Sequence, residues 1–140
     1  MISKSPHAQM LINLEEIYAT IPLINCQHCH ICDGPIIWFR PEEINIRKYL
    51  QKHKQPYIVW SEEEFKHNNM KCPYLQKNQC SIYPVRPFIC RLQGTIPDLP
   101  CKKNNKPILT KIQTQTILTN FKNFLIETNS FTTFFSTKKH

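Results

Sequence analysis

Seven cysteines, at positions 26, 29, 32, 72, 80, 90 and 101, constrain this 140-residue chain more than any other feature. An odd number of cysteines cannot all pair within one chain, and residues 1–10 lack the apolar stretch of a secretory signal. In the reducing cytoplasm thiolates serve as metal ligands rather than as halves of disulfides. The sequence therefore predicts a cytoplasmic protein that binds metal through cysteine.

The first three cysteines form the run Cys26-Gln-His-Cys29-His-Ile-Cys32. A C-x-x-C pair lets two sulfurs reach one metal, and the third cysteine continues the wrap, so a fourth ligand must come from elsewhere. A bacterial ferredoxin would place that ligand at position 36, which is Ile36. Radical enzymes that use S-adenosylmethionine need C-x₃-C-x₂-C, and zinc ribbons need two C-x₂-C knuckles. Neither pattern is present.

The remaining cysteines lie in two boxes and one isolated position. Cys72-Pro-Tyr-Leu is followed by Cys80-Ser-Ile-Tyr-Pro-Val-Arg-Pro-Phe-Ile-Cys90-Arg, and then by Cys101. Together with the first cluster, these boxes resemble the CxxCxxCC cysteine-cluster family of zinc- or iron-chelating domains (the YkgJ type). The family pattern is C-x-x-C-x-x-C-C, then C-P-x-L, then C-x-I-Y-x-x-R-P-x-x-C-R. The likeness covers residues 26–101 and implies a metal or iron–sulfur domain of a kind also found in flagellin lysine N-methylases.

The chain departs from this pattern at one position. The family usually doubles the last cysteine of the cluster, and this chain has Asp33 in that place. A site that needs an eighth ligand would have to use Asp33, His28, His30 or solvent, or would be absent. The histidines also fit an exposed loop, and Asp33 also fits a turn before Gly34-Pro35.

All seven cysteines are candidate ligands, and thiolates suit both zinc and iron–sulfur clusters. We expect one [4Fe–4S] cluster, with zinc, alone or beside a cluster, as the alternative. Four thiolates would complete one site, and the other three with a histidine would make a second. The predicted metal ligands are Cys26, Cys29, Cys32, Cys72, Cys80, Cys90 and Cys101.

Composition excludes several function classes. Gly34 and Gly94 are the only glycines, so the glycine-rich loops of P-loop and Rossmann proteins are excluded. No run of about 18 apolar residues predicts a membrane span. The net charge is +8, with seven lysines and one acid in residues 102–140, but metal-bound thiolates would offset part of it.

The sequence allows three classes of function for a protein that binds this metal. The first is a metal-binding domain whose metal is at least structural. The second is a cluster-dependent modifying or redox enzyme, like the N-methylase relatives, with an open position on the metal and a protein substrate or partner. The third is a zinc-stapled nucleic-acid-binding module, which nothing in the spacing specifically supports. No arrangement typical of nucleophilic catalysis is present, so the sequence does not decide whether the protein is an enzyme.

Arginines and aromatic residues lie close in sequence to the cysteines of the two later boxes. Arg86 and Arg91 flank Cys90, where they can neutralise an anionic sulfur site or hold a substrate carboxylate or phosphate. Alternatively, they form a structural ion pair or clamp the backbone. Tyr74, Tyr83 and Phe88 are expected to form a hydrophobic cover that keeps water from the metal.

The predicted fold class is α+β: small and loop-rich, with helices around a metal-stapled cysteine cluster and a few short strands. One domain is expected over residues 1–126, followed by a frayed basic tail over 127–140. Helices are predicted over 8–19, from Pro41 to about His53, from a capping box at Ser61 and Glu64, and over 108–126. Strands are predicted at 36–39 and 80–83, and the rest of 72–101 is expected to be loops. The expected buried face of the last helix comprises Ile108, Ile112, Leu118, Phe121 and Leu125.

Overall fold

The computed structural model describes residues 6–23, 37–77, 79–99, 106–130 and 133–135. Its α-helices are α1 (Pro6–Ala19), α2 (Arg40–Lys52), α3 (Glu62–His67), α4 (Phe88–Leu92) and α5 (Lys111–Glu127), and η1 (Tyr83–Val85) is a 3₁₀-helix. Its strands are β1 (Ile37–Phe39), β2 (Leu75–Gln76), β3 (Gln79–Cys80) and β4 (Thr133–Phe135). A mostly helical fold with a few short strands confirms the predicted α+β class.

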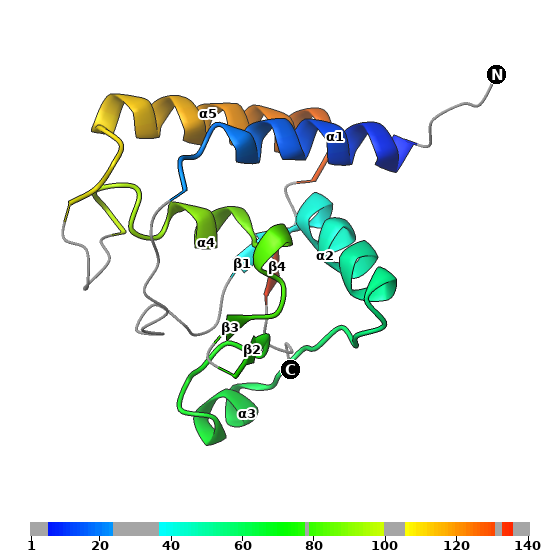
Figure 1. Ribbon diagram of the computed structural model, residues 1–140. Helices are drawn as coiled ribbons and strands as arrows, with labels where there is room; N and C mark the ends of the chain where they lie inside the picture. Colours follow the sequence, from blue (N-terminus) through cyan, green and yellow to red (C-terminus); the bar gives the residue numbers. More distant parts are fainter. Residues whose placement is uncertain (1–5, 24–36, 78, 100–105, 131–132, 136–140) are drawn as a thin grey trace.

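The elements form two regions, each with its own core. Helices α1 and α5 lie side by side as one layer over α4 and β1, and the β2–β3 hairpin and α3 lie at the far end of the molecule (Figure 1). The upper core lies under the helix layer and comprises Leu14, Tyr18, Ile21, Phe88, Leu92, Ile96, Ile117, Phe121, Phe124 and Leu125. The lower core comprises Trp38, Ile46, Leu50, Tyr74, Ile82 and Val85, and Cys72 and Cys80 pack against it. The cysteine boxes are thus attached to hydrophobic packing rather than to loose loops.

Local signals place the starts of three helices. Pro41 lies in the first turn of α2, where its missing N–H costs nothing. The hydroxyl of Ser61 accepts from the amide of Glu64, whose carboxylate accepts from the amide of Ser61, so the capping box predicted for α3 is confirmed. Thr110 and Gln113 form the same reciprocal pair at the start of α5.

The buried face of α5 differs from the expected one. Phe121 and Leu125 are buried, but Ile112 is 80% exposed and Ile108 and Leu118 also face solvent. At about 100° per residue, Ile112 lies about 180° around the helix from Phe121, so both cannot point into one core. The residues that do are Thr114, Ile117, Phe121, Phe124 and Leu125. Thr114 tolerates this burial because its hydroxyl donates to the carbonyl of Thr110 at 2.7 Å.

The structure corrects two other expectations. It also places β4 within residues 127–140, where this strand pairs antiparallel with β1 in the register Trp38↔Phe134. The strand expected at 80–83 ends at Cys80, and the chain turns into η1 at Tyr83. The segment expected to be all loops contains α4, which begins directly after Pro87. No helix in the described part of the chain is long and apolar enough to cross a membrane.

Candidate metal centre

A short hairpin brings Cys72 and Cys80 into one region. The amide of Leu75 donates to the carbonyl of Cys72 at 3.0 Å, which turns the chain into β2, and β2 pairs with β3 so that Leu75 faces Cys80. The amide of Ser81 donates to the carbonyl of Tyr74 at 2.7 Å and extends this pairing past Cys80. Both cysteines are half-buried. The C-P-x-L box and the start of the last box therefore form one structural unit.

Tyr74 secures this unit to the rest of the lower core. Its side chain is 1% exposed, and its hydroxyl accepts from the amide of Ile58 and donates to the carbonyl of Ile58. Burial raises the pKa of Tyr74 to about 12, so the hydroxyl stays a neutral donor at physiological pH. The predicted role of Tyr74 as hydrophobic cover thus has a physical basis beside the cysteines.

Cys90 lies on α4, and arginines hold the chain around it. Arg91 donates from Nε to the carbonyl of Arg86 at 2.9 Å and from Nη2 to the carbonyl of Pro84 at 3.0 Å. Arg86 donates from Nε to the carbonyl of Tyr83, and its guanidinium carbon lies 3.8 Å from the centre of the Tyr83 ring. These contacts correspond to the backbone clamp, one of the roles that the sequence allows for the arginines.

The thiols of Cys72 and Cys80 act electrostatically on the thiol of Cys90. Burial raises the pKa of the Cys90 thiol well above its usual value, and the nearby Cys72 and Cys80 raise it further, while Arg86 opposes the shift. None of the three forms a disulfide with another described cysteine. A bound cation favours the thiolate form, so a metal would reverse this shift at each ligand.

The chemistry of this donor set fits zinc or iron, because soft thiolates are the ligands that both prefer. Within the described ranges, however, no group of three or more Cys, His, Asp or Glu side chains is close enough to hold an ion. Cys72, Cys80 and Cys90 lie in one region, but the three together do not form such a group. The other predicted ligands, Cys26, Cys29, Cys32 and Cys101, lie outside the described residues, as do His28, His30 and Asp33.

Glu42 is a buried acid beside this region whose role the sequence does not reveal. It is 1% exposed, and its Oε2 accepts from the hydroxyl of Tyr18 at 2.6 Å and from the amide of Phe88. Its Oε1 accepts from the amide of Phe39 at 3.2 Å. Burial raises the pKa of Glu42 to about 7, although these three hydrogen bonds and Arg91 act in the opposite direction.

The raised pKa of Glu42 can be tested by comparing the pH dependence of stability in wild type and in Glu42→Gln. In the unfolded chain Glu42 has a pKa of about 4.5, so the folded state, with a pKa of about 7, binds the proton more tightly. The stabilisation from that proton is complete below about pH 4.5 and is lost as pH rises to 7. The shift corresponds to about 3 kcal/mol. In the metal-free, reduced protein, the unfolding free energy of wild type minus that of Glu42→Gln should fall by about this amount between pH 4.5 and 8.

Urea unfolding at several pH values measures this difference. Glu63→Gln, at an exposed position of α3, serves as the matched control for loss of an acid. A difference between wild type and Glu42→Gln that is independent of pH contradicts the prediction.

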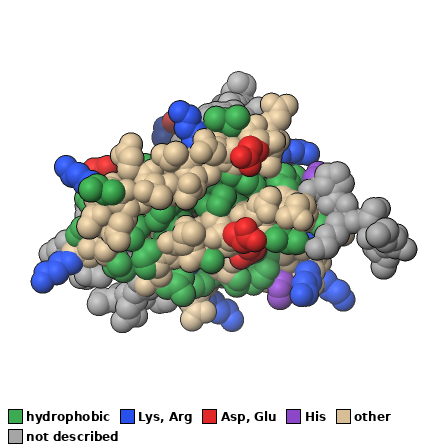
Figure 2. Space-filling model, turned by 90° about the horizontal axis from the view of Figure 1, so that it is seen from above, with side chains coloured by type: hydrophobic (Ala, Val, Ile, Leu, Met, Phe, Trp, Pro, Cys, Tyr) green, Lys and Arg blue, Asp and Glu red, His purple; other side chains and the backbone are tan. Residues whose placement is uncertain are grey.

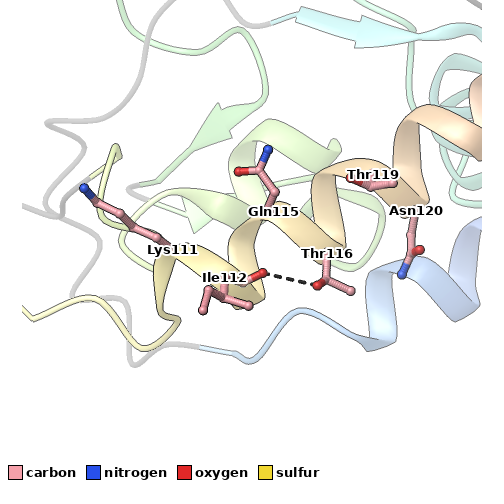
Figure 3. A pocket seen from close by; sticks show the side chains of 6 residues that line it. All are labelled: Lys111, Ile112, Gln115, Thr116, Thr119 and Asn120. Carbon is pink, nitrogen blue, oxygen red and sulfur yellow. Dashed lines mark hydrogen bonds between the residues drawn. The ribbon is translucent and has the colours of Figure 1, made fainter.

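A hollow on the surface lies away from the cysteines. It is an open depression along α5, with Lys111 and Asn120 at its ends and a hydrogen bond of 3.2 Å from the Thr116 hydroxyl to the carbonyl of Ile112 (Figure 3). The described residues that line it are Lys111, Ile112, Gln115, Thr116, Thr119 and Asn120. Because no cysteine box contributes to this lining, the hollow is not part of the candidate metal centre.

Comparison with known proteins agrees with the cysteine pattern. No curated protein and no solved structure matches the chain. One family model does match, over residues 25–122: the CxxCxxCC model, whose description reads "Putative zinc- or iron-chelating domain". This range includes all the cysteines, the whole lower core and half of the upper core. The chain therefore belongs to the CxxCxxCC family of zinc- or iron-chelating domains.

Proposed function

We propose that this domain binds an iron–sulfur cluster, [4Fe–4S] in our preferred assignment, through ligands drawn from Cys26, Cys29, Cys32, Cys72, Cys80, Cys90 and Cys101. The observation that carries the proposal is the gathering of Cys72, Cys80 and Cys90, which are up to 18 positions apart in sequence, in one electrostatically coupled region. The first cluster supplies three more thiols at a spacing suited to a single centre. Zinc bound by the same thiolates is the alternative.

The charge around the second box supports an anionic centre. Four thiolates around a [4Fe–4S]²⁺ core or around Zn²⁺ leave a site charge of −2. Arg86 and Arg91 lie beside Cys90 with their guanidinium groups held on aromatic rings, at 3.8 Å from Tyr83 and Tyr18 respectively. Fixed positive charge at this place would offset the charge of the metal site without mobile counterions.

The nucleic-acid alternative receives less support from the surface. Figure 2 shows the face formed by α1 and α5, where hydrophobic and tan-coloured atoms cover most of the surface, acidic side chains stand among them, and the Lys and Arg side chains stand apart toward the edges. A nucleic-acid interface needs basic residues grouped along one groove or face. This face therefore does not support the nucleic-acid alternative, and on the cysteine pattern we propose a metal centre, in a reducing compartment such as the cytoplasm.

Metal and sulfide analysis of anaerobically purified protein tests the proposal. We expect a brown protein with about four iron and four acid-labile sulfide per chain and a broad absorbance in the visible range. A colourless protein with one or two zinc ions per chain contradicts the cluster and leaves zinc chelation. A folded protein that holds neither metal contradicts metal binding altogether.

The ligand count then separates a structural role from an enzymatic one. Four protein sulfurs on each metal make a closed site, suited to stabilising the fold or transferring electrons. Three sulfurs and an exchangeable position would support a cluster-dependent modifying enzyme. Spectroscopy of the loaded protein with and without an added small ligand, such as cyanide or azide, distinguishes the two cases.

A further inference from the structure

Glu42 connects three elements of the fold through one carboxylate. Its hydrogen-bond donors are the hydroxyl of Tyr18 on α1, the amide of Phe39 at the end of β1, and the amide of Phe88 at the start of α4. Both oxygens are used, and the side chain is 1% exposed. Burying a carboxylate costs free energy unless its charge is compensated, so these three donors stabilise Glu42 in its buried position.

The contact with Phe88 fixes the position of Cys90. Phe88 is the first residue of α4, and the amide of Cys90 donates to the carbonyl of Pro87 at 3.0 Å, so Cys90 lies within the same helical turn. A shift at Phe88 would therefore move the sulfur of Cys90. The ring of Phe88 is also buried against Phe121, which restrains the same residue from the side of α5.

Arg91, the residue after Cys90 on α4, also restrains the position of this helix. Its guanidinium carbon lies 3.8 Å from the centre of the Tyr18 ring, while Tyr18 donates to Glu42. The charged groups that act on this unit are Glu42 and Arg91, with Glu15 of α1 acting on Tyr18 and Arg91, and Arg86 acting on Arg91. Two elements thus hold α4 in place. Glu42 of α2 binds its first amide, and Tyr18 of α1 contacts its Arg91.

We propose that Glu42 is a positioning residue for the Cys90 ligand: it fixes α4 through the amide of Phe88 and so presents the Cys90 sulfur to the metal. This inference rests on the proposed function, because it assigns Cys90 as a ligand. Glu42 does not touch the metal. Its effect is the preorganisation of one ligand, the kind of outer contact whose loss typically weakens metal binding by about 10–100-fold.

The carboxylate suits this task better than its close analogues. Leucine, of similar size, leaves the donors on Tyr18, Phe39 and Phe88 without an acceptor. Glutamine keeps one carbonyl oxygen but turns an NH₂ group toward one of these donors. The two substitutions should therefore form a graded series in which the anchor on Phe88 is lost or partly kept.

The experiment uses the full chain loaded anaerobically with Co²⁺ and, separately, with Zn²⁺. Affinity is measured by competition with a chelator, and the alkylation rate of each cysteine in the loaded protein is measured by mass spectrometry. Glu42→Leu should weaken binding by about 10–100-fold and speed alkylation of Cys90 more than that of Cys72 or Cys80. Glu42→Gln should change both quantities in the same direction and by less.

Leu50→Ala is the matched control, because Leu50 is buried on the same helix but lies in the lower core. A general loss of stability should speed alkylation without selecting Cys90. Unchanged protection of Cys90 in Glu42→Leu, or the same selective exposure in Leu50→Ala, overturns the role of Glu42 while leaving metal binding intact. If Glu42→Leu does not fold, the comparison of Glu42→Gln with Leu50→Ala decides by the same criterion. Wild-type protein that binds neither Co²⁺ nor Zn²⁺ overturns zinc chelation, and the same alkylation comparison is then made on protein reconstituted with iron and sulfide. Wild-type protein that also holds no cluster overturns the proposed function and this inference together.

Discussion

Replacing Cys90 by alanine is expected to lower the affinity of the protein for metal by more than about 100-fold. Structural zinc sites contribute about 10–16 kcal/mol of binding free energy, so one of four thiolates accounts for about 3 kcal/mol. That loss corresponds to more than about 100-fold in the dissociation constant. Cys90 lies on a helix that is held through hydrogen bonds of Glu42 and Arg91, which fix the position of its sulfur.

The same substitution should affect the metal-free protein little. Cys90 is half-buried, and alanine removes only its sulfur, so the change in unfolding free energy should be about 1 kcal/mol or less. The large effect should therefore appear only in the loaded form. Chelator competition measures the affinity, and urea unfolding with and without metal measures the two stabilities.

Two further variants make this result specific. Gln79→Ala alters an exposed neighbour of Cys80 and should leave metal affinity unchanged. Cys72→Ala should reproduce the loss seen for Cys90 if both boxes supply ligands to one centre. Affinity within about threefold of wild type in Cys90→Ala would remove Cys90 from the ligand set, and the site would then have to be sought in the first cluster.

The sequence predicts well those features that depend on neighbouring residues. The capping box of Ser61 and Glu64 is set by side chains three positions apart, and Pro41 carries its own preference for the first turn of a helix. The two cysteine boxes are likewise recognisable because ligand spacing is a local property. The assignment to the CxxCxxCC family follows from that spacing and is confirmed by the family model.

Features that depend on distant partners escaped prediction. β4 is stabilised by pairing with β1, almost 100 residues earlier. The sequence of Thr133–Phe135 alone does not indicate which strand it pairs with. Helix α4 is short and follows a proline-rich stretch, so propensity alone favours a loop. In α5, the expected face is correct at Phe121 and Leu125 but wrong at Ile112, which is exposed. The polar residue Thr114 is buried instead, so residue size alone does not identify the buried face.

Glu42 illustrates the same limit at the candidate site. In sequence it follows Pro41 and resembles an exposed acid at the positive end of a helix dipole. Its amide contact with Phe39 is local and fits that interpretation. Its contacts with Tyr18 and Phe88 are 24 and 46 positions away, and they turn an ordinary helix start into a buried junction beside the cysteines.

The second large effect is expected at Phe121, where the helix layer meets α4. The side chain is 4% exposed, and its ring centre lies 3.9 Å from that of Phe88 in a stacked arrangement and 5.7 Å from that of Phe39 in an edge-on arrangement. Phe124 adds a further ring contact along α5, at 6.2 Å. Phe121 thus joins α5 to both α4 and β1.

Phe121→Ala should lower the free energy of unfolding by about 3–5 kcal/mol, because it removes buried apolar surface and leaves a cavity among three aromatic rings. Phe121→Leu keeps most of the volume and should cost less. Asn120→Ala, at the adjacent exposed position, should stay within about 0.5 kcal/mol of wild type. Urea unfolding of the metal-free protein, followed by circular dichroism, measures all three.

A connection between the upper core and the metal centre follows from the same contacts. Phe88 stacks on Phe121 and donates its amide to Glu42, so a cavity at Phe121 loosens the residue that sets the start of α4. Phe121→Ala should therefore also weaken metal binding, and it should do so less than Cys90→Ala, because the sulfur is still present. Combining Phe121→Ala with Glu42→Leu should give a smaller loss of affinity than the sum of the two single losses, since both act through Phe88. Strict additivity would mean that the two residues reach Cys90 by separate routes, which would contradict a single junction at Phe88.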